Sequence, residues 1–273
     1  MVKTNNSITD KNFKKLSIQI SLNGLSFCCS DLLTNSIYSA HSIDFKKYPK
    51  NFTMENSIWK TFLEYDELTK TYDEVIVLHE NNLNTFVPAP FFDEDYKGSY
   101  LQYNTKVFET DYFSFDTIDN QDMVNVYVPY VNVNNYLIDQ FGSFEYKHSC
   151  SILVAKLLDA SKNIDAVKMY IHVASNHFEI IVIQNHQLQL FNTFEYQTAD
   201  DFLYYLLFTA EQLHLNPETF KLLLLGEISE NDALYQKAYQ YIRNIDFLDT
   251  SDLEQKNTFS TKENRKNFIL FNS

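Results

Sequence analysis

The chain has 273 residues, of which 45% are hydrophobic, so it can bury a large core and is not a disordered protein. Its formal net charge of −14 argues against nucleic-acid binding, because affinity for a phosphate backbone depends on Lys and Arg side chains. The three cysteines lack metal-ligand and paired-disulfide spacing, and no apolar run is long enough to span a membrane. These features predict a soluble, cytoplasmic protein.

The chain begins with a polar segment, residues 1–15, which lacks the apolar centre of a signal peptide. Two strands are expected at 16–21 and 25–30, and Asn23-Gly24 between them predicts a hairpin because both residues tolerate positive φ. Further elements follow in order: a strand at 36–45, a helix at 54–70, a buried strand at 73–80 and a short strand at 85–87.

The middle of the chain predicts a compact β-α-β-α block, with Gly142 as the C-cap of its first helix. Its strands are expected at 124–128 and 143–148, and its helices at 131–141 and 149–161. We expect this block to form a small subdomain, residues 104–162, inserted between a first half at 16–103 and a second half at 163–249.

The last third predicts a three-stranded meander followed by a helix, a strand, a helix and a strand. The expected strands are 167–173, 178–184 and 188–196, then 220–225 and 245–248, and the expected helices are 198–213 and 232–242. Thr198 and Asp201 resemble a capping box at the start of the first helix. The polar segment 250–273, which ends in Phe268-Ile269-Leu270-Phe271, is expected to be a flexible tail with an apolar tip.

The β-β-β-α-β-α-β order, complete after residue 165 and shortened before residue 90, resembles the superfamily of actin, sugar kinases and Hsp70 ATPase domains. Residues 85–92 resemble the strand-to-helix connection of Hsp70-type ATPases, and residues 222–227 resemble an adenosine-binding motif. The block at 124–161 is similar to the small subdomain of the cell-division actin FtsA and of the type IV pilus actin-like protein. The whole chain resembles an uncharacterised bacterial family of this superfamily. The resemblance implies an α/β, actin-like (ribonuclease H-like) fold with duplicated halves.

The resemblance also implies a nucleotide cleft, where two hairpins present backbone N–H groups to phosphates and an Asp in each positions Mg²⁺. In the first hairpin Ser21 stands where the family carries Asp, and Gly24 after Asn23 is the one glycine left. The second hairpin contains Ser175 and Asn176, with neither the Asp nor the glycines.

The third nucleotide element, the adenosine motif, retains Gly226 but continues with Glu227, whose carboxylate would crowd or repel a nucleotide. Departures at three separate elements predict a vestigial cleft without catalytic residues, metal or cofactor. The leading hypothesis is therefore a non-catalytic scaffold or adaptor that binds a protein partner. The alternative is an ATP- and magnesium-binding ATPase or kinase with atypical motifs.

Two other groups of residues bear on chemistry. His172, His177 and His186 lie near two turns of the meander but lack metal-ligand spacing, so polar turn residues are the better interpretation. Cys150 follows His148 at a strand–helix junction, where a helix N-terminus can activate a thiol. Adjacent His and Cys residues rarely form a working catalytic pair, and we expect none here.

The C-terminal segment leaves several alternatives open. Lys262, Arg265 and Lys266 precede the apolar run 268–271, an arrangement similar to the membrane-targeting tail of FtsA-like proteins but much shorter. Four apolar residues are too few for stable anchoring, which argues against a third hypothesis, a membrane-linked assembly factor. The segment is instead expected to dock on its own domain, or to add a strand to its own or a partner's sheet edge.

Overall fold

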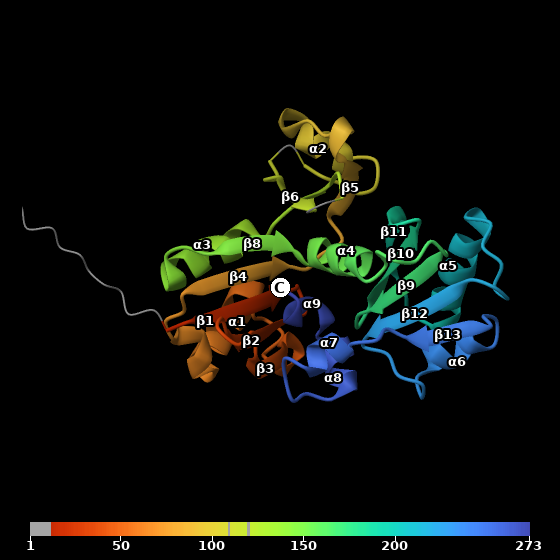
Figure 1. Cartoon of the computed structure of the whole chain (residues 1–273). Coiled ribbons are helices and arrows are strands. Elements are labelled where there is room, and N and C mark those ends of the chain that lie inside the picture. The colour runs from red at the N-terminus through yellow and green to blue at the C-terminus, as the bar shows by residue number, and fades with distance from the viewer. Residues whose placement is uncertain (1–11, 109, 119–120) are drawn as a thin grey trace, which may run out of the picture.

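The computed structural model describes residues 12–108, 110–118 and 121–273; most of the expected N-terminal tail, residues 1–11, lies outside this part. Two five-stranded sheets form two halves, and a three-stranded sheet projects from them as a smaller unit (Figure 1). The first half uses N-terminal elements and the second half the last third of the chain. The expected duplicated α/β fold is confirmed.

The first half has the strand order β3-β2-β1-β4-β8. β1 pairs antiparallel with β2 and parallel with β4, and β8 extends the sheet in parallel beyond β4. The elements of this half are β1 (Lys14–Ile20), β2 (Gly24–Asp31), β3 (Ile37–Asp44), η1 (Phe45–Lys47), α1 (Met54–Glu64), η2 (Asp66–Thr69), β4 (Glu74–His79), α3 (Val131–Phe141), β8 (Glu145–His148) and α4 (Ser149–Asp159).

The second half repeats this arrangement with the strand order β11-β10-β9-β12-β13. β12 pairs in parallel with β9 and β13, as β4 does with β1 and β8. Its elements are β9 (Lys168–Val173), β10 (His177–Gln184), β11 (Gln187–Glu195), α5 (Ala199–Gln212), β12 (Lys221–Gly226), α6 (Ala233–Tyr239) and β13 (Asn244–Phe247).

The sheet pairing corrects the expected middle block of the chain. Residues 104–162 do not form one subdomain, because β8 joins the first sheet beside β4 and α3 packs its Val133 and Leu137 into the core of the first half. The first copy of the β-β-β-α-β-α-β order is therefore complete rather than shortened. It is interrupted after β4 and resumes at α3.

The inserted unit is instead a three-stranded antiparallel sheet with the order β5-β7-β6. Its elements are β5 (Asn84–Pro88), η3 (Ala89–Phe91), η4 (Glu94–Tyr96), α2 (Lys97–Leu101), β6 (Ser114–Ile118) and β7 (Met123–Tyr127). Val87, Leu101, Val124 and Val126 form its small separate core. Of the expected β-α-β-α block, the first strand (β7) belongs to this unit, and the other three elements, α3, β8 and α4, belong to the first half.

The C-terminal segment is folded rather than flexible. It contains α7 (Ser251–Glu254), α8 (Thr261–Lys266) and α9 (Phe268–Phe271), and all four residues of α9 are buried. A capping box between Ser260 and Glu263 starts α8. Of the alternatives for this segment, docking on its own domain is correct, and the segment docks as helices rather than as an added strand.

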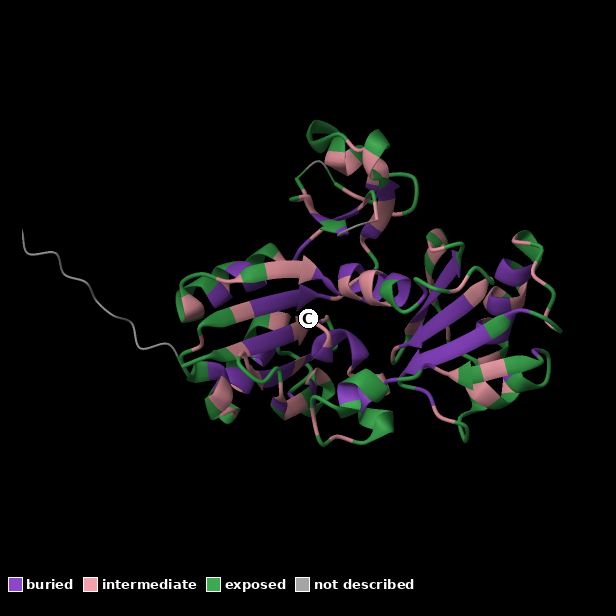
Figure 2. Ribbon diagram, viewed as in Figure 1, coloured by how far each residue is buried: buried purple, intermediate pink, exposed green. Residues whose placement is uncertain are grey.

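Three hydrophobic clusters explain how the halves hold together. One lies inside each half, and a third combines residues of both halves with α4 and α9, including Leu78, Leu157, Leu225 and Phe271. The apolar run of β4 is continuous because both faces of the strand are buried. Val77 packs in the cluster of the first half, and Leu78 packs in the shared cluster. Figure 2 shows the buried strands at the centre of both halves.

Several local predictions are confirmed at single residues. Thr198 and Asp201 form the capping box at α5, and Gly142, with φ of 76°, caps the C-terminus of α3. The β10–β11 hairpin turns through Asn185 and His186, whose φ angles of 50° and 62° fit a two-residue type I′ turn. Within the described residues, no helix has the length and apolar character to cross a membrane.

Candidate functional site

A cleft of about 330 Å³ lies between the halves, at the ends of β1, β9 and β12. The structure brings Ser21, Asn23, Gly24, Ser175 and Glu227 together in its lining. The other two expected cleft residues, Asn176 and Gly226, directly adjoin lining residues in the chain without lining the cleft themselves. Five of the seven residues that the resemblance indicated therefore line one cleft. The chemistry of this cleft depends on the hydrogen bonds and charges of each hairpin.

The β1–β2 hairpin uses its polar groups internally. The Ser21 N–H donates to the Gly24 carbonyl (2.9 Å), and the Ser21 hydroxyl oxygen accepts from the Asn23 N–H (3.3 Å). The expectation of positive φ here is wrong, since neither Asn23 nor Gly24 has it. Gly24 serves close packing instead: a Cβ there would lie 2.6 Å from the Ile43 carbonyl oxygen of neighbouring β3. No glycine-rich phosphate loop exists at this hairpin.

The β9–β10 hairpin lies over a buried carboxylate. The Glu179 side chain contacts His172 Nδ1 at 2.8 Å and His177 Nε2 at 3.2 Å. Burial raises the pKa of Glu179, but the hydrogen bonds and positive charge of the two histidines outweigh burial and hold it well below its ordinary value. Burial lowers the pKa of His177, while its hydrogen bond and ion pair with Glu179 raise it to about 9.

His172, His177 and Glu179 form an ion-pair network, whereas the sequence interpretation assigned the two histidines to polar turns and did not consider Glu179. The missed signal is the two-residue period of a strand: His177 and Glu179 share one face of β10, and His172 lies directly opposite Glu179 in register. His186 is elsewhere, beside Asp165 at 3.2 Å. Among the described residues, no group of three or more His, Cys, Asp or Glu side chains is arranged to hold a metal ion.

The end of β12 forms the third wall of the cleft. Gly226 has φ of 88°, and a Cβ there would lie 2.2 Å from the Val173 carbonyl oxygen, so glycine is required. The next residue, Glu227, donates its N–H to that same carbonyl (2.7 Å) and pairs its carboxylate with Lys266 Nζ of α8 (2.9 Å). The C-terminal segment thereby places a cation and a helix beside the cleft.

In addition to the Lys266–Glu227 pair with the second half, the C-terminal segment contacts the first half and packs on itself. Lys15 Nζ of β1 donates to the backbone carbonyl of Ser273 (3.0 Å). The Cys28 thiol of β2 lies 3.8 Å from the carbonyl oxygen of Leu270. Phe271 stacks on Phe259, with ring centroids 5.3 Å apart. The chain's own C-terminus therefore fills the space between the halves.

The His148–Cys150 pair is structural. His148 Nδ1 accepts the Cys150 backbone N–H (3.1 Å) and so caps α4. Burial lowers the pKa of His148 to about 3, so its ring is neutral. Burial also raises the pKa of the Cys150 thiol well above its ordinary value, which is the opposite of activation. The hypothesis of a nucleophile at this junction is not supported.

Beside this pair, a buried carboxylate ties the inserted unit to the first half. Asp116 of β6 accepts from the Ser151 hydroxyl (2.5 Å) and from the His148 N–H (2.8 Å) with one oxygen. Its other oxygen accepts from the Tyr127 hydroxyl (3.0 Å). Burial raises the pKa of Asp116 despite these hydrogen bonds. The network joins β6 and β7 to the start of α4 and holds the inserted unit in place.

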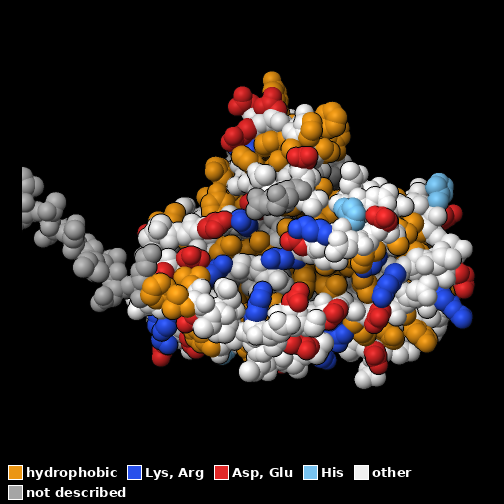
Figure 3. Space-filling model, viewed as in Figure 1, with side chains coloured by type: hydrophobic (Ala, Val, Ile, Leu, Met, Phe, Trp, Pro, Cys, Tyr) orange, Lys and Arg blue, Asp and Glu red, His pale blue; other side chains and the backbone are white. Residues whose placement is uncertain are grey.

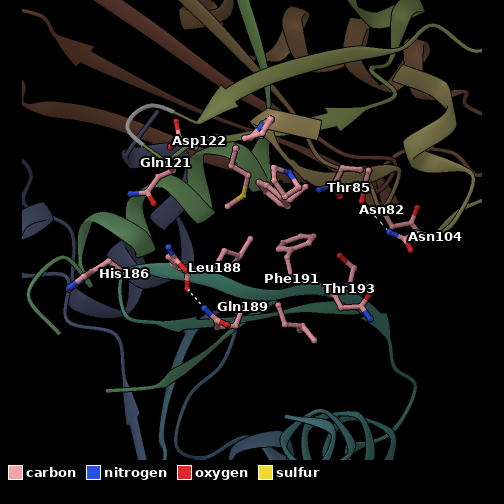
Figure 4. Close-up of a pocket in the computed structure, with 18 of the residues that line it drawn as sticks. Asn82, Thr85, Asn104, Gln121, Asp122, His186, Leu188, Gln189, Phe191 and Thr193 are labelled. Atoms are coloured by element: carbon pink, nitrogen blue, oxygen red, sulfur yellow. Dashed lines mark hydrogen bonds between the residues drawn. The ribbon is translucent and has the colours of Figure 1, made fainter. Parts of the chain in front are cut away.

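A second and larger cavity, about 980 Å³, lies between the inserted unit and the second half (Figure 4). One wall is β11, from which Leu188, Gln189, Phe191 and Thr193 line it, and the opposite wall includes Thr85. Eight of the 20 lining residues are Asn or Gln, so amide groups dominate its polar surface. No local sequence pattern indicates this groove, because its two walls are about 100 residues apart in the chain.

The inserted unit also carries exposed aromatic side chains, and hydrophobic atoms are prominent on its surface in Figure 3. The most exposed are Phe91, at 75%, and Tyr103, at 89%. Acidic and basic side chains are interspersed over the rest of the face shown. The inserted unit therefore exposes large aromatic side chains to solvent next to the groove.

Comparisons with known proteins agree with this architecture. The family described as "Protein of unknown function (DUF3822)" matches residues 3–245. A Bacteroides thetaiotaomicron protein of actin-like ATPase fold and unknown function is similar in structure, with a TM-score of 0.80, 21% identity, and coverage of 91% of this chain and 97% of that one. The PilM–PilN type IV pilus biogenesis complex contains another similar chain, with a TM-score of 0.58, 12% identity, and coverage of 94% and 96%. No curated protein matches. These likenesses establish the actin-like fold.

Proposed function

The chain belongs to the DUF3822 family of proteins of unknown function, and we propose that it is a non-catalytic, actin-like binding protein whose inter-half cleft holds no nucleotide. The observation that carries this proposal is the chemistry of the cleft lining. Its ionisable side chains other than His172 are the carboxylates of Asp44, Glu80 and Glu227 and the ammonium groups of Lys46 and Lys266.

Both lysines of the cleft have carboxylate neighbours. Lys266 pairs with Glu227 at 2.9 Å, and Lys46 lies 4.0 Å from Asp44. Glu80 accepts a hydrogen bond from Gln19 (2.8 Å). With three carboxylates against two lysines, the lining has a formal charge of −1, whereas phosphate sites present cations or converging backbone N–H groups. A triphosphate would meet net repulsion here.

Magnesium does not compensate for this charge. The resemblance to the actin superfamily implies an Asp in each hairpin, and the corresponding stretches offer Ser21 and Ser175, whose hydroxyls are weak ligands for a hard cation. The cleft volume of about 330 Å³ is also at the lower end of the ~300–1,000 Å³ typical of ligand sites. The residues present therefore do not fit a magnesium nucleotide.

Without a nucleotide in the cleft, the function of this chain depends on binding through its exposed surface. The ordered C-terminus fixes both halves to each other, and the inserted unit presents exposed aromatic residues such as Tyr103 and Phe91. Exposed aromatic groups are enriched where proteins bind one another. A protein of similar fold is part of the PilM–PilN type IV pilus biogenesis complex, which agrees with a binding role for this chain.

The proposal is tested by phosphate release from ATP and Mg²⁺ with the full chain and with Ser175→Trp as a matched variant. Ser175 is exposed at the cleft, so tryptophan obstructs the cleft without adding a charge or disturbing a core. We expect no phosphate release that differs between the two proteins. Turnover by the full chain that disappears in the variant would establish the alternative, an ATPase or kinase with atypical motifs.

A further inference from the structure

The groove of Figure 4 is bounded by unpaired sheet edges on both sides. β11 is the outermost strand of the second sheet, and β5 is the outermost strand of the inserted sheet. The rings of Phe86 on β5 and Phe191 on β11 contact each other, with centroids 4.8 Å apart, which fixes the spacing of the walls. An unpaired strand edge offers a row of N–H and C=O groups to another extended chain.

The hydrogen-bond alternation identifies which groups of β11 face outward. The Ala174 N–H donates to the His177 carbonyl (2.9 Å), so His177 and every second residue after it face β9. Residues between them face β11, and thus Ile180 pairs inward with Asn192. The bond from the Tyr196 N–H to the Asn176 carbonyl (3.2 Å) continues this pattern.

The backbone groups of Phe191 and Thr193 therefore point away from the sheet, on the edge that the groove exposes. The Thr193 N–H donates to the side-chain oxygen of its neighbour Asn192 (2.9 Å), a local bond that an incoming backbone carbonyl can replace. Both residues line the groove. This edge is ready to accept a strand without any break in the existing ladder.

A buried amide oxygen on the opposite wall also lacks a partner. Asn84 lines the groove and is only 7% exposed. Its side-chain nitrogen donates to Asn125 (3.2 Å), but its Oδ1 atom has no hydrogen-bond partner among the described residues. This oxygen atom is itself buried, so a ligand in the groove reaches it only after neighbouring side chains move.

The charge and length of the groove define the ligand class. Asp122 and His186 are its ionisable lining residues, in a chain with a net charge of −14, so recognition does not depend on strong ligand charge. Residues 187–193 of β11 line it continuously and span about 20 Å at ~3.4 Å per residue. Amide side chains and a free strand edge match the repeating N–H and C=O groups of a polypeptide.

We propose that this groove binds an uncharged, extended polypeptide segment of about seven residues, which adds as a strand to the outer edge of β11. The inference rests on the proposed function in one respect, since it names the partner class of a binding protein. It does not depend on an empty nucleotide cleft, because the groove and the cleft share no lining residue.

The test uses a phage-displayed library of random seven-residue peptides, panned on the full chain with the Thr193→Pro variant as counter-selection. Proline removes an outward N–H and is tolerated on edge strands, so the inner ladder stays intact. The most enriched peptide is synthesised with a fluorescent label, and its affinity is measured by polarisation. We expect a loss of about tenfold or more for Thr193→Pro, and a change within about twofold for Thr193→Val, which keeps the N–H and the side-chain shape.

A second measurement on the unaltered protein decides the case if Thr193→Pro does not fold. N-methylation of alternate backbone nitrogens in the peptide should abolish binding in one register and spare it in the other, as a strand ladder requires. Failure to enrich any peptide, equal binding to Thr193→Pro, or insensitivity to the N-methyl register would overturn the proposal. ATP binding or turnover in the cleft would contradict the proposed function and leave these outcomes unchanged.

Discussion

Leu270→Ala tests whether the C-terminal helix holds the two halves together. Leu270 is 2% exposed and belongs to the shared cluster that includes Leu157 of α4 and Leu225 of β12. Leu→Ala changes in cores cost about 2–5 kcal/mol, because apolar contact is lost and a cavity remains. At ~2–4 °C per kcal/mol for a chain near this size, the unfolding midpoint should fall by about 4–20 °C.

The matched control is Leu63→Ala in α1, where the leucine is 60% exposed. Surface changes usually stay within about 0.5 kcal/mol, so this variant should unfold within about 2 °C of the unaltered chain. Thermal unfolding followed by circular dichroism, repeated as a urea titration, measures both variants. Equal shifts for the two variants would refute the structural role of the segment and restore the flexible tail expected from the sequence.

Three further predictions concern two glycines, the ion pair between His177 and Glu179, and a buried cysteine. Gly226→Ala should destabilise the fold more than Gly142→Ala in urea, because both glycines have positive φ but only the Cβ at 226 would collide with backbone. Since the pKa of His177 rises from 6.5 to about 9 on folding, its contribution to stability is full below pH 6.5 and declines as pH rises towards 9. The depressed pKa of Glu179 contributes stability above 4.5 that is lost in acid, so a urea midpoint series should decline at both ends and Glu179→Gln should flatten it. Cys150, buried with a raised pKa, should react with a thiol reagent such as Ellman's only after unfolding, and fast reaction in the folded protein would contradict its structural assignment.

The second half was predictable because its signals are local. Each strand of the meander is bounded by a polar turn, and α5 begins at a capping box that can be read from Thr198 and Asp201. Strand ends shifted by only one or two residues between prediction and structure. The meander strands β9, β10 and β11 pair in chain order, and β12 returns beside β9 after α5, so most pairings in this half follow the local pattern.

The first half was harder because its sheet is assembled across the insertion. β8 pairs with β4, which places Tyr146 beside Val77 although the 65 residues 80–144 separate the two strands. Nothing in either strand specifies that pairing, and the pattern of the middle block suggested a local subdomain instead. Long-range parallel pairing is a property of the whole sheet, so a local pattern does not reveal it.

The candidate sites also combine features that local sequence predicts with features that depend on long-range folding. The resemblance indicated the cleft lining at Ser21 and Glu227, but the ion pair with Lys266 depends on where the C-terminal segment folds. The Ser260–Glu263 capping box was a local sign that this segment is helical, and it was overlooked. The groove along β11 had no comparable sign, since it exists only where the inserted unit approaches the second half.

The central claim is that the actin-like cleft holds no magnesium nucleotide, and the most direct test is the thermal unfolding midpoint with and without millimolar ATP and Mg²⁺. A ligand at ~100 times its Kd stabilises the folded state by about 2.7 kcal/mol. That stabilisation would raise the midpoint of a chain near this size by about 5–10 °C. We predict no such rise at several millimolar nucleotide, and a rise of this size that is lost in Ser175→Trp would contradict the claim.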